Sequence, residues 1–202
     1  MKRHYNFSGG VPADFFNISS LTAKSDTRFR VEDGHIVNAY NENIGDYDYI
    51  SILTSKRYGG KVTMSTRCSF DSFGAPLIVF TDDFRTDETG HNFYGLHFEI
   101  VAYENGINIW HIIPAAEGAP RPIKVTKIAF AEFDVEAGKE LELTVTVEGK
   151  RITARMAGSD GQIHTLTVEN DDIPERFHVG ITACEGINRF ASFTVEGIEN
   201  GN

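Results

Sequence analysis

The chain lacks several features that identify whole classes of protein. Its 202 residues contain no uninterrupted run of about 18 apolar residues, so the sequence predicts no transmembrane helix. The N-terminal stretch MKRHYNFSGG has a basic start, but no apolar segment follows it as in a secretory signal. We therefore expect a cytoplasmic protein.

Cysteine and metal-binding patterns are also scarce. The two cysteines, Cys68 and Cys184, are expected to be reduced thiols, with a single disulfide as the alternative. No Cys-x-x-Cys or His-x-x-x-His spacing offers a structural zinc site. The acid-rich stretch 82–88, DDFRTDE, is the one candidate for calcium, because oxygen-rich loops can bind that ion. It lacks the EF-hand spacing, so a solvated charged loop is the alternative and no cofactor is predicted.

The chain has fewer basic than acidic residues. Lys and Arg number 19 against 29 Asp and Glu, the formal net charge is −10, and no basic cluster stands out. Phosphate contacts depend on Lys and Arg, so neither nucleic acid nor an anionic membrane is an expected partner. No Gly-x-Ser-x-Gly, P-loop or Gly-x-Gly-x-x-Gly motif is present. The oligomeric state is left open.

Segments in which apolar and polar residues alternate dominate the chain. Such alternation, broken by Gly- and Asn-containing turns, is typical of an all-β sandwich or barrel. A single domain spanning residues 1–202 is expected, with one short helical candidate at 12–21 and a proline-rich surface loop at 114–122. Besides the two runs around Asn105-Gly106, the predicted strands are 27–32, 35–39, 48–54, 61–70, 76–82, 123–134, 140–148, 150–157, 162–169, 177–184 and 190–198.

The stretch 97–112, HFEIVAYENGINIWHI, predicts a hairpin with one unusual face. A two-residue turn at Asn105-Gly106 would pair Glu104 with Ile107, and therefore Tyr103 with Asn108 and Val101 with Trp110. Opposed residues project to the same face. The core face would hold Phe98, Ile100, Ala102, Ile109 and Ile113, and the other face His97, Glu99, Tyr103, Asn108 and Trp110.

Two further strands predict faces by the same alternation. In 61–70 the apolar side comprises Val62, Met64, Cys68 and Phe70, which leaves Arg67 on the opposite side. In 177–184 the apolar side comprises Phe177, Val179 and Ile181, opposite His178. Glu185 follows on a turn, where binding residues often lie.

Several segments resemble the concanavalin A-like lectin/glucanase sandwiches. The resemblance is carried by ERFHVGITACEGINRFASFTVEG (175–197), RFRVEDGHIV (28–37), YGLHFEIVAYENGINIWHI (94–112) and ELELTVTVEGKRITARMAG (140–158). Within that superfamily the chain is most similar to bacterial 3-keto-disaccharide hydrolase-like domains and to sandwich-type carbohydrate-binding modules. The resemblance implies a jelly roll of two antiparallel sheets that binds saccharides on its concave sheet. It also makes Arg67, His97, Glu99, Trp110 and His178 candidates for that sheet.

The leading hypothesis is a binding protein for an oligosaccharide or polysaccharide. Trp110 and Tyr103 would stack on a sugar ring, because aromatic walls with a few placed polar groups are typical of small-molecule sites. The hydroxyls would be bound by polar side chains from the same sheet and the following turn, namely Arg67, Glu99, Asn108, His178 and Glu185.

Two alternatives remain open. A sugar-acting hydrolase would use Glu99 as general acid or base, assisted by His97 or His178. Glycoside hydrolysis normally needs a second carboxyl group, and none stands two residues from Glu99. The other alternative is an interaction protein whose polar face is structural, with Trp110 buried and Glu99 paired with Arg67 or a lysine.

Overall fold

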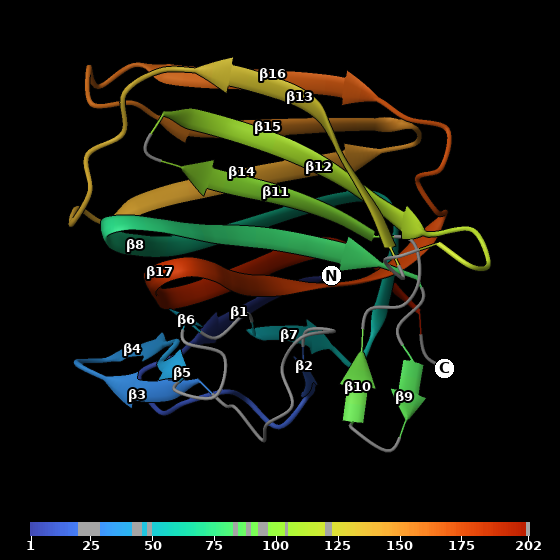
Figure 1. Ribbon diagram of the computed structural model, residues 1–202, viewed down its shortest axis with the longest axis horizontal. Coiled ribbons are helices and arrows are strands. Elements are labelled where there is room, and N and C mark those ends of the chain that lie inside the picture. The colour runs from blue at the N-terminus through green and yellow to red at the C-terminus, as the bar shows by residue number, and fades with distance from the viewer. Residues whose placement is uncertain are drawn as a thin grey trace.

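The computed structural model describes residues 1–19, 29–41, 46–47, 50–82, 85–87, 90–92, 97–103, 105–119 and 123–200. These residues form strands, turns and connections, and none of them lies in a helix. Among them, accordingly, no helix is long and apolar enough to cross a membrane. Figure 1 shows the strands stacked in two layers, with β11, β12 and β13 in front of β14, β15 and β16. The predicted all-β sandwich is therefore confirmed.

The front layer carries the hairpin that the sequence singles out. Its order is β13-β12-β11-β8-β17-β7-β2-β10-β9, and all its neighbours are antiparallel except β10 and β2. The bounds are β13 Ile123–Glu132, β12 Gly106–Pro114, β11 His97–Tyr103, β8 Arg57–Thr81, β17 Arg176–Asn200, β7 Ile50–Thr54, β2 Phe15–Ser19, β10 Gly90–Asn92 and β9 Arg85–Asp87.

The back layer closes the sandwich from the other side. The same strands β8 and β17 continue into it, where β1 pairs with β17, and β14, β15 and β16 follow beyond β8. These strands are β1 Lys2–Asn6, β14 Leu141–Glu148, β15 Arg151–Ala157 and β16 Ile163–Glu169. Four short strands complete the fold: β3 Arg30–Glu32, β4 His35–Val37, β5 Tyr40–Asn41 and β6 Asp46–Tyr47.

Strands β8 and β17 each run for 25 residues and belong to both layers. They bend together at glycines that leave no room for a side chain. A Cβ on Gly74 would lie 2.5 Å from the Cβ of Phe70 on the same strand, and one on Gly186 of β17 would lie 2.2 Å from the carbonyl oxygen of Phe73 on β8. The buried Asn188 amide fixes the bend by donating to the carbonyl oxygens of Cys184 and Glu185, at 3.2 and 2.8 Å. The predicted strands 61–70 and 76–82 are thus parts of one bent strand, as are 177–184 and 190–198.

The core lies between the layers and follows the predicted alternation. On β8 and β17 both predicted apolar faces are confirmed, since every one of their side chains is at most 1% exposed. Phe80 stacks on Phe98 at a centroid distance of 4.9 Å and contacts Phe177 at 4.7 Å, which joins three neighbouring strands. Burying each such side chain stabilises the fold by about 1.5–3 kcal/mol.

The predicted helix at 12–21 is wrong. Residues 15–19 form β2, which pairs with β7 from Phe15–Thr54 to Ser19–Ile50. Phe15 enters the main core, while Ile18 packs on Leu53 and Val79 on the other face of the sheet. Because both faces of this strand are buried, its apolar residues do not alternate cleanly, and the strand pattern is hidden in the sequence.

Substituting Gly74 tests the bend. We expect Gly74→Ala to lower the free energy of unfolding by about 1–3 kcal/mol, the usual cost of overpacking a tight site. Gly9→Ala is the matched control, since a Cβ there meets nothing within 4 Å. Urea denaturation measures both variants, and equal stabilities would show that the close approach at Gly74 imposes no constraint.

Candidate functional site

The β11–β12 hairpin has a register two residues away from the predicted one. Tyr103 pairs with Gly106, Val101 with Asn108, and Glu99 with Trp110. The predicted pairs of Tyr103 with Asn108 and Val101 with Trp110 are therefore wrong, and Glu104 lies outside the described residues. A shift of two residues preserves the faces of both strands, because side chains alternate with a period of two. The predicted grouping of Glu99, Tyr103, Asn108 and Trp110 on one face follows in either register.

That face, which we call the outer face, points away from the core between the layers. Glu99 lies between Trp110 of β12 and Val79 of β8 in the sheet. Trp110 and Tyr103 are partly buried and pack against a small apolar cluster of Ala75, Leu77 and Val101. The outer face thus combines an aromatic surface with polar groups.

Asn108 is the polar group with the most unusual environment. Its side chain is 5% exposed, and its Oδ1 atom is buried without a hydrogen-bond partner in the described structure. An unpaired buried acceptor normally costs about 1–3 kcal/mol. Glu99 is buried to a similar degree, with 8% exposure. Asn108 therefore places a largely buried amide on the outer face, between the aromatic side chains.

Strand β13 adds two residues that the sequence does not point to. Trp110 pairs with Lys127, and Asn108 pairs with Phe130. Residues three apart on a regular strand face opposite sides, but a β-bulge opposite Ile109 and Trp110 adds one residue to β13. Lys127 and Phe130 therefore both reach the outer face. No residue type in 123–134 marks this bulge, so only the pairing shows it.

The resulting aromatic surface is accessible at the edge of the front layer. Phe130 is 39% exposed and Trp110 is partly exposed. The ammonium of Lys127 lies over both rings, 5.0 Å from the centroid of Trp110 and 5.2 Å from that of Phe130. We call these three residues, with Asn108, the aromatic platform.

His178 lies on the outer face of β17, but both of its ring nitrogens are engaged. Nδ1 donates to the carbonyl oxygen of Thr54 at 2.8 Å, because a carbonyl can only accept. Nε2 accepts from Nε of Arg57 at 3.1 Å, so the ring is neutral. Burial lowers the pKa of His178, and the neighbouring Arg57 charge lowers it further. These contacts suit a structural role better than proton transfer.

The remaining predicted residues are spread over the molecule. His97 begins β11 and pairs with Ile112 and Thr81, and its side chain lies outside the described part of the structure. Glu185 is exposed at the bend of β17, where its φ is 52°. It is thus beyond the end of the front layer rather than within it.

The prediction that Arg67 joins this face is wrong. Arg67 lies in the back-layer part of β8, paired with Glu142 of β14 and Ser192 of β17. Its Nε donates to Oε1 of Glu140 at 3.0 Å on the surface. The bend in β8 is the reason, because residues 61–70 and 77–81 of this strand belong to different layers.

A hydrolase that used Glu99 as general acid or base would need a second carboxyl group nearby. Its cross-strand neighbours, Trp110 and Val79, carry no carboxyl group. Across the described ranges, no group of three or more His, Cys, Asp and Glu side chains is placed to hold a metal ion. Of the acidic stretch 82–88, only the side chain of Asp82 is described.

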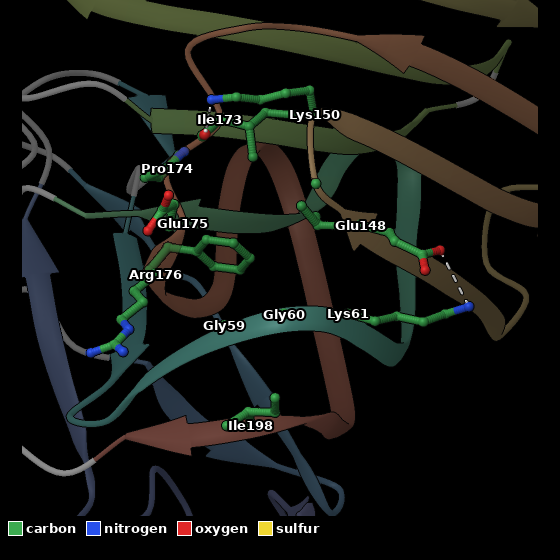
Figure 2. Close-up of a pocket in the computed structure, with 13 residues that line it drawn as sticks. Gly59, Gly60, Lys61, Glu148, Lys150, Ile173, Pro174, Glu175, Arg176 and Ile198 are labelled. Carbon is green, nitrogen blue, oxygen red and sulfur yellow. Dashed lines mark hydrogen bonds and ion pairs between the residues drawn. The ribbon is translucent and has the colours of Figure 1, made fainter.

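A pocket separate from the outer face lies where the β14–β15 turn faces the connection into β17 (Figure 2). It is an open pocket of about 670 Å³, lined by 59–61, 147–150, 173–177 and Ile198. Its charged rim is largely engaged: Lys61 pairs with Glu148 at 3.4 Å, and Nζ of Lys150 donates to the carbonyl oxygen of Ile173 at 2.8 Å. None of the predicted site residues lines it.

Solved structures match this architecture, although no family model and no curated protein matches the sequence. The Lotus tetragonolobus seed lectin has a TM-score of 0.63 at 11% identity over 100% of both chains. Lectin I-B4 from Griffonia simplicifolia has a TM-score of 0.60 at 13% identity, also over 100% of both chains. The carbohydrate-binding module CBM66 from Bacillus subtilis has 0.54 at 15% identity, over 89% of this chain and 99% of that one. The chain therefore has the concanavalin A-like sandwich fold that its sequence resembles.

The burial of neutral His178 predicts a pH dependence of stability. Since its pKa is lowered in the folded state, the unfolded chain takes up the proton first as pH falls through about 6.5, the ordinary value for histidine. His178 therefore lowers the free energy of unfolding below that pH, by at most about 1.4 kcal/mol per pH unit. His178→Gln, whose amide can also donate to Thr54 and accept from Arg57, should show a shallower loss between about pH 8 and pH 5. Identical slopes in urea denaturation would contradict this assignment.

Proposed function

We propose that this protein binds saccharides, and that the aromatic platform on the outer face is its binding site. The observation that carries the proposal is the accessible aromatic pair of Trp110 and Phe130 on one face of the sheet. The amide of Asn108 lies on the same face, next to Trp110 along β12 and opposite Phe130 on β13. A sugar ring presents both an apolar C–H surface and hydroxyl donors, so it matches both kinds of group.

The chemistry of the platform supports this ligand class. Trp110 and Phe130 offer partly exposed aromatic faces on which a sugar's C–H groups can pack. The amide of Asn108 supplies a polar group beside these rings, as small-molecule sites commonly do. Rigid strands hold all three side chains, so little conformational entropy is lost on binding.

The comparisons support the same class of ligand. One matching structure is a lectin from Bauhinia forficata in complex with GalNAc, with a TM-score of 0.60, and another is the lumenal domain of VIP36 in its Ca²⁺/Man2-bound form, with 0.57. The described residues of this chain contain no comparable metal cluster. We propose a site that binds the saccharide through direct contacts with the platform.

Trp110→Ala tests the site. We expect it to weaken saccharide binding at least about tenfold, because buried aromatic anchors dominate binding energy. As Trp110 is the only tryptophan, its fluorescence in the unchanged protein reports on ligands directly, and glycan-array retention compares the variants.

Two variants serve as controls for Trp110→Ala. Phe73→Ala removes a surface aromatic that is 46% exposed at the bend of β8, and Arg67→Met removes a charge from the back layer. Both should retain glycans as the unchanged protein does. The proposed site is wrong if Trp110→Ala retains every glycan as well as these controls do.

A further inference from the structure

Lys127 occupies the place on the platform where a sugar ring would settle. Its ammonium lies 5.0 Å from the centroid of Trp110 and 5.2 Å from that of Phe130. A cation in this position is attracted by the negative faces of the rings. Any ligand that stacks on Trp110 must therefore either displace Lys127 or interact with it.

Lys127 also has no acidic partner among the residues that the structure describes. No carboxylate oxygen of the described residues lies within 4.0 Å of its Nζ, whereas Lys61 and Lys139 pair with Glu148 and Glu136 at 3.4 and 2.6 Å. This is notable in a chain with ten more acidic than basic residues. The aromatic rings hold the ammonium in place, and no carboxylate of the described ranges compensates its charge.

From these two observations we infer that the platform selects saccharides that carry an acidic group, a carboxylate or a sulfate, and that Lys127 determines this selectivity. The inference rests on the proposed saccharide site. A neutral ring would displace the ammonium and lose its attraction to the rings. An acidic ring can stack beside the ammonium and accept a hydrogen bond from it, so the contact with the aromatic faces is kept.

The positions of Lys127 and Glu99 on either side of Trp110 determine how such a ligand is oriented. Glu99 lies on the opposite side of Trp110 from Lys127, because β12 is between β11 and β13. An anionic substituent is therefore expected over β13, with the hydroxyls toward Asn108. The net charge of −10 does not prevent this, since physiological salt screens charges beyond about 8 Å and the nearest charge then decides.

The test is a glycan array in which each uronic acid oligosaccharide accompanies its carboxyl-reduced counterpart, which has the same rings and linkages without the charge. Sulfated oligosaccharides and their desulfated forms make a second arm and distinguish the two acidic groups. We expect acidic forms to bind about fivefold more tightly than their neutral counterparts, the ratio that corresponds to a strong exposed ion pair. The ratio should fall as sodium chloride is added.

Lys127→Met removes the charge and keeps the apolar length of the side chain. In this variant the acidic and neutral forms should bind equally, and the neutral forms should bind at least as well as they do to the unchanged protein. Lys124→Met is the matched control, because Lys124 is exposed on the same strand but pairs with Ile113, on the other face. It removes the same charge and should leave the ratio near fivefold.

The outcomes separate this inference from the proposed function. If glycans bind and Trp110→Ala abolishes their binding, but acidic and neutral forms bind alike, the site stands and the role of Lys127 is wrong. The same holds if Lys127→Met and Lys124→Met keep the same ratio. If no glycan is retained above the level of Trp110→Ala, both the site and its selectivity are wrong.

Discussion

The close approach of β8 and β17 at their shared bend is the constraint on which the rest of the structure depends. Each strand contributes to both layers, so the position of the bend decides which of its residues face the front sheet. Glycine is required where the two backbones touch, and the Asn188 amide holds the turn between Cys184 and Gly186. With these two strands fixed, β11 is positioned against β8, and β12 and β13 follow by pairing.

The aromatic platform depends on this order of strands and on the β-bulge in β13. The front layer ends at β13, which pairs with no described strand beyond β12. The bulge in β13 brings Lys127 and Phe130 to the same face as Trp110. Closer to the centre of the layer, His178 and Glu99 are buried, and His178 is engaged by Thr54 and Arg57. The proposed binding residues thus lie at the edge of the layer, and His178 and Glu99 lie farther inside.

Much of the fold could be predicted because alternation is a local property. The faces of 61–70 and 177–184 and the grouping of Trp110 with Asn108 follow from period two alone. The hairpin register does not, since it depends on which residues close the turn. The layer of Arg67 depends on a bend made by residues distant in the sequence, and the bulge in β13 has no marker of its own. The second face of β2 is buried by tertiary contacts, which hides its strand pattern.

The most direct test of the account is a ¹H–¹⁵N spectrum of the protein titrated with the glycans that it retains on an array. Trp110 supplies the only indole signal, and Asn108 supplies a side-chain amide signal beside it. The account predicts that both signals shift together and saturate at the same glycan concentration. Shifts confined to 59–61, 147–150 and 173–177, with the Trp110 indole unchanged, would place binding in the pocket beside the β14–β15 turn and contradict the account.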